Sequence, residues 1–187
     1  MLILGSSSPR RADLLKILTS NFRILKPDFD ESLIKASPNE YPLLEAKNKY
    51  FSIKNSAKPQ DFIICCDTVV VLDNNIFGKP KDKNEAFLML KKLSNNTHEV
   101  ISGYVLGTSE KILSQKTVTT KVTFNKLTDE QIKKYIKEEY VLDKAGSYAI
   151  QDDEKYHLIN KIEGSYYNVV GFPLEEIRND LLFFKVI

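Results

Sequence analysis

The sequence has few of the residues that build metal centres or disulfide bridges. It contains only two cysteines and two histidines in 187 residues. Cys65 and Cys66 are neighbours in a predicted strand, where adjacent side chains point to opposite faces and a disulfide between them would be strained. His98 and His157 are far apart in the chain, so these four residues do not form a zinc site. We expect two buried thiols in a reducing cytoplasm.

Long apolar runs and an excess of one charge are also absent. The longest apolar runs, 62–66 and 68–72, are far shorter than the ~20 residues of a membrane span. Residues 1–4 are followed at once by glycine and serines, with no basic leader, so we expect no secretory signal. The 27 Lys and Arg residues nearly balance the 25 Asp and Glu residues, which excludes binding to nucleic acid or to an anionic membrane by bulk charge.

The length and the residue pattern predict one mixed α/β domain, which could be split into two lobes. Apolar periodicity, capping signals and turn residues predict helices at 9–18, 38–55, 83–93, 129–138 and 173–183. They predict strands at 1–4, 22–25, 61–72, 99–107, 117–124, 147–150, 158–162 and 166–170, with a hairpin turn at 108–111. The buried stripe of the first helix is expected to contain Leu14, Leu15, Ile17 and Leu18.

The segment 5–11 is the first candidate site. A strand leads through Gly5 and three serines into a helix that starts at Pro9, with Ser8 as the expected N-cap. Such a helix start presents free N–H groups and the positive end of the dipole, and Arg10 and Arg11 add bidentate donors. The pattern favours a phosphate pocket. The alternative is an ordinary capped helix with exposed arginines.

Asp67 is the second candidate, because it interrupts the most apolar stretch of the chain. A carboxylate in that position needs a hydrogen bond, a cation or a metal ion, since burying it bare costs several kcal/mol. The alternative is that the strand bends or ends at Asp67 and the carboxylate is solvated. Even then the residue would lie at a strand end, where ligand sites of α/β sheets are found.

Two further segments are less specific when they are considered alone. Lys79 stands in a Gly-Lys-Pro turn and is one lysine among many, so a solvated turn is the favoured interpretation of this segment alone. The segments 143–151 and 164–173 combine small and aromatic residues, which suggests strands that pack tightly near a cleft. Asp143 and Lys144 could form a local ion pair.

Taken together, the motifs resemble the Maf family. They are Ile-Leu-Gly-Ser-Ser-Ser-Pro-Arg-Arg at 3–11, Cys-Asp-Thr-Val-Val at 66–70, Gly-Lys-Pro at 78–80, Leu-Ser-Asn-Asn-Thr-His-Glu-Val-Ile-Ser-Gly at 93–103, Asp-Lys-Ala-Gly-Ser-Tyr-Ala-Ile-Gln at 143–151 and Gly-Ser-Tyr-Tyr-Asn-Val-Val-Gly-Phe-Pro at 164–173. These motifs occur in the family's order and extend over nearly the whole chain.

The resemblance implies a two-lobed, Maf/Ham1-like α/β fold with a long mixed sheet flanked by helices and a deep central cleft. It implies a nucleoside triphosphate pyrophosphatase that cleaves between the α- and β-phosphates with a divalent metal cation, Mg²⁺ or Mn²⁺. The Asp-Thr pair at 67–68 and the Ile-Gln ending at 150–151 resemble the branch that acts on dTTP, UTP and modified pyrimidine nucleotides. A cytoplasmic homodimer is the expected form.

The same resemblance assigns roles to individual residues. Asp67 is the proton acceptor and, with Glu31, a metal ligand. The residues that face the substrate are Ser6, Arg10, Arg11, Lys49, Thr68, Lys79 and Gln151, of which Arg10, Thr68 and Gln151 are tied to base choice. The chain departs from the family pattern at Gly5, Cys66 and Asp152.

A second function remains open at this point: a nucleotide-binding interaction protein linked to septum formation, with little turnover. The basic residues would serve either function. A carboxylate at Asp67 that faces a polyanion favours the enzyme, because a pure binder has no need of it. A phosphatase that releases orthophosphate is a third reading, and the reaction product distinguishes it from the first.

Overall fold

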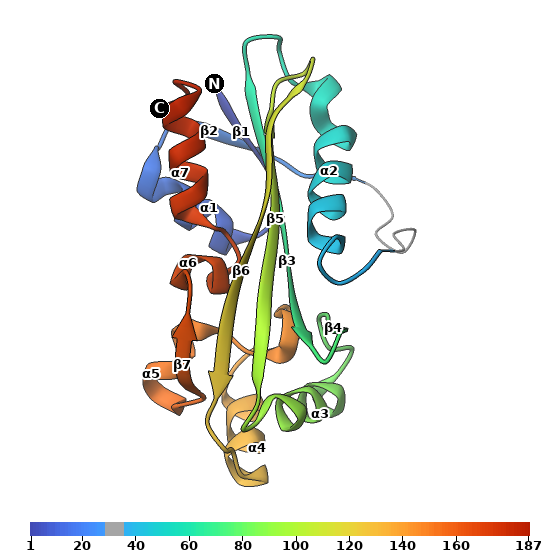
Figure 1. The fold of residues 1–187 in the computed structure, drawn as a ribbon, viewed down its shortest axis with the longest axis vertical. Helices are drawn as coiled ribbons and strands as arrows, with labels where there is room; N and C mark the ends of the chain where they lie inside the picture. The colour runs from blue at the N-terminus through green and yellow to red at the C-terminus, as the bar shows by residue number, and fades with distance from the viewer. Residues whose placement is uncertain (29–35) are drawn as a thin grey trace. The chain divides into compact units, whose positions relative to one another are not determined.

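The computed structural model describes residues 1–28 and 36–187, which form two compact units (Figure 1). Unit 1 contains Met1–Thr68, Ser102–Val118 and Gly171–Ile187, and unit 2 contains Val69–Ile101 and Thr119–Val170. Seven strands of the described residues form one sheet in the order β2-β1-β3-β5-β6-β7, with β4 paired to β3. The strands β3 (Phe62–Leu72), β5 (Thr97–Gly107) and β6 (Ile112–Phe124) contribute residues to both units. The predicted mixed α/β fold is therefore confirmed.

Unit 1 is built around a short parallel part of the sheet. The strand β1 (Leu2–Gly5) pairs in parallel with both β2 (Phe22–Leu25) and β3. The helices α1 (Pro9–Leu18) and α7 (Leu174–Phe183) lie on one face of these strands, and α2 (Tyr41–Ile53), continued by the 3₁₀ turn η2 (Lys54–Ser56), lies on the other (Figure 1). On the α2 face, the core is formed by Ile3, Ala46, Tyr50, Ile53, Ile63, Cys65 and Val105.

The alternation of side chains along β3 determines the direction of its polar residues. Ile63 and Cys65 face α2, so Asp67, two residues on, belongs to the same face. Thr68 points to the opposite face, towards α1 and α7. One strand thus presents a carboxylate to one side of the sheet and a hydroxyl to the other.

Unit 2 has its own core between helices and the far ends of the long strands. Its elements are β4 (Asn75–Phe77), α3 (Lys83–Leu93), α4 (Asp129–Glu138), η3 (Ala145–Ser147), η4 (Ile150–Asp152), α5 (Asp153–Tyr156), β7 (Ile159–Glu163) and α6 (Tyr166–Val170). Asp82 caps α3 by accepting from two backbone N–H groups, and Thr128 with Gln131 forms a complete capping box on α4. Leu90, Tyr135 and other buried residues of the two helices pack into one cluster.

Most of the predicted elements are confirmed, including the helices at 83–93 and 129–138 and the long hairpin, whose turn is closed by a hydrogen bond from Thr108 N to Lys111 O. The second helix begins at Tyr41 rather than at residue 38. Glu40 does accept from Ser37, as a capping box requires, but residues 38–40 form a turn. In α1, Leu14 and Leu15 are buried as predicted, whereas Ile17 is exposed.

The strands predicted at 147–150 and 166–170 are wrong. Gly146 and Ser147 both have φ of 67°, in the left-handed region, which produces a 3₁₀ turn rather than an extended strand. Residues 166–170 form the short helix α6, whose start is capped by Ser165: its hydroxyl oxygen accepts from Asn168 N. Local capping therefore outweighs the β-propensity of Tyr and Val in this segment.

None of the helices in the described part of the chain is long and apolar enough to cross a membrane.

Candidate active site

The candidate site lies in unit 1, where β1 ends and β3 continues. β1 pairs with β3 only as far as Gly5 and Cys65, so the edge of β3 beyond Cys65 has no β1 residue beside it. The chain order places β2 on one side of β1 and β3 on the other. Such a switch point at the carboxyl ends of parallel strands is where open α/β sheets bind ligands.

Gly5 and Ser6 shape the turn that leaves β1. A Cβ atom on Gly5 would overlap Cys65 Sγ and Ile53 Cδ1, so a larger residue where β1 approaches β3 would require these two side chains to shift. Ser6 is buried, and its Oγ accepts a hydrogen bond from Ser8 N at 3.1 Å. Ser8 has the extended backbone of an N-cap, although its side chain makes no capping bond. The predicted helix start is confirmed, and Ser6 supplies the hydroxyl that orders it.

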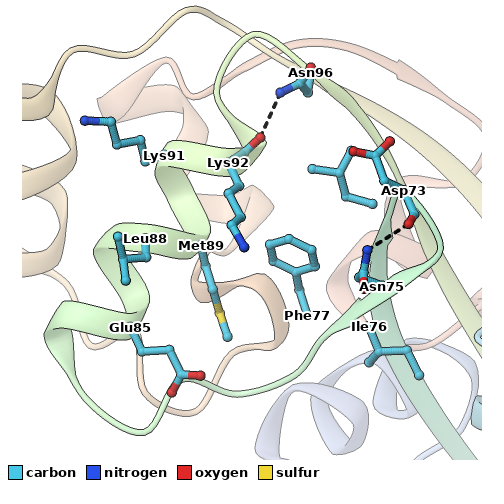
Figure 2. A pocket seen from close by; sticks show the side chains of 11 residues that line it. Asp73, Asn75, Ile76, Phe77, Glu85, Leu88, Met89, Lys91, Lys92 and Asn96 are labelled. Carbon is cyan, nitrogen blue, oxygen red and sulfur yellow. Dashed lines mark hydrogen bonds between the residues drawn. The ribbon is translucent and has the colours of Figure 1, made fainter.

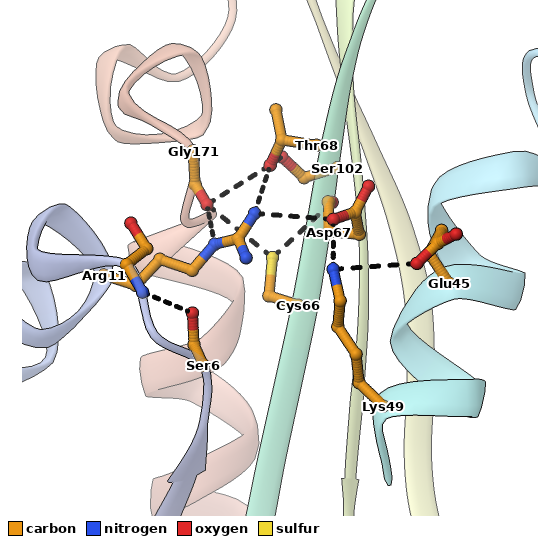
Figure 3. A network of polar contacts seen from close by, with 10 residues as sticks. Ser6, Arg11, Glu45, Lys49, Cys66, Asp67, Thr68, Ser102 and Gly171 are labelled. Atoms are coloured by element: carbon orange, nitrogen blue, oxygen red, sulfur yellow. Dashed lines mark hydrogen bonds and ion pairs between the residues drawn. The ribbon is translucent and has the colours of Figure 1, made fainter. Parts of the chain in front are cut away.

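Asp67 pairs with cations on both sides (Figure 3). Its Oδ1 accepts from Lys49 Nζ at 2.5 Å and lies 3.9 Å from Arg11 Nη2. The side chains of Asp67, Lys49 and Arg11 are 18%, 11% and 13% exposed. β3 continues through Asp67 to Leu72, so the reading in which the strand ends at a solvated Asp67 is wrong.

Helix α2 brings a second carboxylate that the sequence analysis missed. Glu45 lies one helical turn before Lys49, and its Oε2 is 3.7 Å from Lys49 Nζ. Its side chain is only 1% exposed. The spacing i, i+4 between an acidic and a basic residue was the available signal. Lys49 therefore stands between two carboxylates that come from two different elements.

Arg11 is held by groups from distant parts of the sequence (Figure 3). Its Nε donates to the carbonyl of Gly171 at 2.9 Å, and its Nη2 donates to Thr68 Oγ1 at 3.4 Å. Thr68 Oγ1 also lies 2.8 Å from Ser102 Oγ and 3.2 Å from the Gly171 carbonyl oxygen. Ser102 and Gly171 occur in the motifs described above, but nothing in the sequence assigned them a contact.

The two thiols are not nucleophiles. Both cysteines are buried and free, as predicted. Burial raises the pKa of the Cys65 thiol to about 12, and burial also raises the pKa of the Cys66 thiol. Both therefore stay protonated at neutral pH and act as small apolar residues on β3.

The other predicted site residues are distributed as follows. Arg10 is half-buried on α1, beside Arg11. Lys79 and Gln151 belong to unit 2, and both are exposed. Glu31 lies outside the described residues. Asp143 and Lys144 form the local ion pair considered above, at 3.1 Å.

Within the described ranges, no group of three or more His, Cys, Asp or Glu side chains is arranged to hold a metal ion. The carboxylates next to the cations are Asp67 and Glu45. A Mg²⁺ ion that is bound together with a nucleotide needs only one or two protein carboxylates, because phosphate oxygens and water molecules complete its coordination shell. The oxygen donors of this site fit that pattern.

A separate hollow of about 680 Å³ lies in unit 2 (Figure 2). It is lined by Leu72, Asp73, Asn75, Ile76, Phe77, Glu85, Leu88, Met89, Lys91, Lys92 and Asn96. It contains none of the residues that the motifs assign to a site, and the side chains around it are a mixture of apolar and charged groups. The arginine–lysine–aspartate cluster in unit 1 is therefore the stronger candidate.

Comparison with known proteins identifies the family of the chain. The profile of the Maf family, described as Maf-like protein, matches residues 1–182. The chain belongs to the Maf family. A Maf relative from Clostridium botulinum (strain Eklund 17B / Type B), named dTTP/UTP pyrophosphatase, is 43% identical over 182 residues and is matched over 96% of each chain. A relative of the same name from Clostridium novyi is 42% identical over 178 residues, which are 94% of this chain and 93% of the relative.

Solved structures agree on the fold of this Maf protein. The Ham1 protein of Staphylococcus aureus aligns with a TM-score of 0.54 at 12% identity, over 98% of both chains. A HAM1 protein from Coxiella burnetii aligns with a TM-score of 0.51 at 12% identity, over 97% of this chain and 98% of that one. The predicted Maf/Ham1-like architecture is confirmed.

Proposed function

We propose that the protein is a nucleoside triphosphate pyrophosphatase that hydrolyses dTTP and UTP to the monophosphate and pyrophosphate. The observation that carries the proposal is the ion pairing of Asp67 with Lys49 and Arg11 where β3 continues past the carboxyl end of β1. Cations beside a carboxylate suit a polyphosphate substrate that reacts with water. The names of the clostridial relatives support this substrate class.

In the proposed reaction, the oxygen of a water molecule bonds to the α-phosphorus while the bond to the bridging oxygen breaks. Asp67 accepts the proton of the water, and pyrophosphate leaves with the bridging oxygen. Lys49 and Arg11 neutralise negative charge on the phosphate oxygens. These oxygens compete with the Asp67 carboxylate for the two cations. Ser6, at the helix start that follows β1, adds a polar group beside the phosphates.

A divalent cation, Mg²⁺ or Mn²⁺, belongs to the proposal. Asp67 and Glu31 would hold it, as the family resemblance implies. When bound, such an ion neutralises phosphate charge and orients the triphosphate. Lys79, Thr68, Arg10 and Gln151 are proposed to contact the substrate, the last three at the base. We propose that the enzyme acts as a homodimer in the cytoplasm, without nucleic acid or membrane partners.

Product analysis tests the function. The purified protein is incubated with Mg²⁺ and each common nucleoside triphosphate in water enriched in ¹⁸O. We expect pyrophosphate from dTTP and UTP, with the label in the monophosphate, because water attacks the α-phosphorus. Release of orthophosphate would establish a phosphatase. A raised melting temperature without any product would establish the nucleotide-binding alternative.

Asp67→Asn tests the role of the carboxylate. We expect the variant to bind nucleotide and to lose turnover by about 10²–10⁴-fold, the usual contribution of a general base. Asp73→Asn is the matched control, since Asp73 is an exposed carboxylate in the turn after β3 and adopts φ of 50°, which asparagine tolerates. Normal pyrophosphate release by Asp67→Asn would remove this residue from the mechanism.

A further inference from the structure

Ser102 has a contact that the proposed function does not use. It lies on β5 and is completely buried, and its Oγ is 2.8 Å from Thr68 Oγ1. Burying a hydroxyl group costs free energy unless it is hydrogen-bonded, and the hydrogen bond to Thr68 offsets this cost for Ser102. Ser102 lies behind Thr68, and Thr68 in turn contacts Arg11 (Figure 3).

The number of hydroxyl protons determines which group donates in each hydrogen bond around Thr68. Thr68 has one hydroxyl proton. The Gly171 carbonyl can only accept, and the Arg11 guanidinium can only donate. If Thr68 donates to Gly171, its oxygen is open to protons from both Arg11 and Ser102. Every contact is then satisfied, with Ser102 donating to Thr68. The opposite assignment would leave two oxygen acceptors 3.2 Å apart with no proton between them.

This arrangement orients the guanidinium plane of Arg11. The plane is fixed at two points, because Nε donates to the Gly171 carbonyl and Nη2 donates to Thr68 Oγ1. Because the guanidinium is planar and rigid, two contacts determine the direction of its remaining N–H groups. Nη2 is also 3.9 Å from Asp67 Oδ1. A small rotation of the Thr68 hydroxyl would therefore change the position of Arg11 relative to Asp67.

We propose that Ser102 is a positioning residue, which holds the Thr68 hydroxyl in the rotamer that aims Arg11 at the reacting phosphate. The inference rests on the proposed function, and it gives Thr68 a task at Arg11 besides the expected one in base choice. Ser102 touches no substrate atom. It acts through the side chains of Thr68 and Arg11, so its effect on turnover requires both of them.

A double-mutant cycle on kcat/KM for dTTP tests the proposal. We expect Ser102→Ala to lower kcat/KM by about fivefold, the value of one hydrogen bond of average strength. Thr68→Val, which keeps the shape of threonine and removes its hydroxyl, should lower it further. In the Thr68→Val background, Ser102→Ala should change kcat/KM by less than about twofold, because the interaction it removes is already gone. A merely structural role of Ser102 would give independent, multiplying losses.

Two further variants complete the design. Ser102→Thr keeps the hydroxyl but adds a methyl group at a fully buried position, so it should lose less kcat/KM than Ser102→Ala. Ser114→Ala is the matched control. It removes another hydroxyl of unit 1, one that donates to Asp180 at 2.6 Å, and should leave kcat/KM unchanged in both backgrounds.

These measurements distinguish failure of the Ser102 role from failure of the proposed pyrophosphatase activity, on which that role depends. If the wild type releases no pyrophosphate, the proposed function is wrong. If the wild type is active and Ser102→Ala keeps its full kcat/KM, the function stands and the positioning role is overturned. Equal losses from Ser102→Ala with and without the Thr68 hydroxyl would also overturn it.

Discussion

The ammonium group of Lys49 lies 2.5 Å from Oδ1 of Asp67. The lysine on α2 therefore neutralises the charge of the proposed base on β3. The same ammonium group is 3.7 Å from Oε2 of Glu45, whose side chain is almost completely buried. One cation therefore lies between two carboxylates in a poorly solvated place, where charges interact strongly.

The first prediction concerns this lysine. Lys49→Met takes away the positive charge next to both carboxylates, and we expect it to lower the free energy of unfolding by about 3–5 kcal/mol, as is typical when one partner of a buried ion pair is removed. The double variant Glu45→Leu with Lys49→Met should recover part of this loss, because the buried charge of Glu45 is then gone and Asp67 keeps its ion pair with Arg11. Urea unfolding measures both effects. Equal stability of the single and double variants would contradict the coupling.

The second prediction concerns the attachment of α7. Asp180 accepts hydrogen bonds from Tyr104, Ser114 and Lys116, each at 2.6 Å. Asp180→Asn places an NH₂ group among these donors, and we expect a loss of about 2–3 kcal/mol in the free energy of unfolding. Asp129→Asn is the control, since its pair with Lys91 is exposed and contributes about 1 kcal/mol or less.

Acid should weaken the same attachment. Burial acts to raise the pKa of Asp180, but the hydrogen bonds from Lys116, Ser114 and Tyr104 outweigh it and hold the pKa below its ordinary value. The stabilisation is therefore complete above the ordinary pKa and is lost as the pH falls through the lowered one. Asp180→Asn should unfold with a weaker dependence on pH in the acidic range. An unchanged acid dependence would contradict this role of Asp180.

The sequence predicted the parts of the site that depend on local pattern. The helix start at Pro9 and the strand through Asp67 follow from capping and β-propensity, which are properties of neighbouring residues. The direction of Asp67 towards α2 was not predicted; it follows from the strand period once Ile63 and Cys65 are seen to face that helix. Lys49 came from the family resemblance, and the structure brings it to Asp67.

The parts that the sequence did not predict depend on contacts between distant segments. The carbonyl of Gly171 reaches Arg11 across 160 positions of the chain, and a backbone carbonyl has no signature in a sequence. Ser102 is one of many serines until β5 places it beside Thr68. The two wrong strands have a local cause: the positive φ of Gly146 and Ser147, and the cap that Ser165 provides for α6.

The third prediction concerns His98, which is buried in unit 2 with its Nε2 2.7 Å from the Tyr148 hydroxyl. Burial lowers the pKa of His98 to about 4, so the folded protein holds it neutral. In the unfolded chain the imidazole of His98 binds a proton below about pH 6.5, whereas in the folded protein it does so only near pH 4. The free energy of unfolding therefore decreases as the pH falls from about 6.5 towards 4.

His98→Gln should remove this dependence on pH. Between pH 7 and pH 5 we expect the wild type to lose about 1–2 kcal/mol more than the variant. The measurement is urea unfolding of both proteins at the two pH values. His157→Asn is the control, because His157 is exposed and its φ of 50° suits asparagine. Equal losses in wild type and His98→Gln would show that the buried imidazole is protonated in the folded state.

The last prediction concerns Tyr135, which anchors the segment that carries Gln151. Its hydroxyl donates to Asp152 Oδ2 at 2.6 Å and accepts from Ala149 N at 3.1 Å, so the residues on either side of Ile150 and Gln151 are tied to α4. Asp152 is a departure from the family pattern, and this contact gives its carboxylate a structural task. If Gln151 contributes to base choice, its position depends on this tie.

Tyr135→Phe removes both hydrogen bonds of this hydroxyl and should therefore lower the discrimination between UTP and GTP, measured as the ratio of kcat/KM values, by about two- to tenfold. Gln151→Ala should lower it at least as much, because it removes the side chain itself. Tyr140→Phe, at an exposed position near the end of α4, is the control and should leave the ratio unchanged. Equal losses of activity on both nucleotides in Tyr135→Phe would contradict a role in base choice, since a loosened scaffold that does not touch the base lowers both rates together.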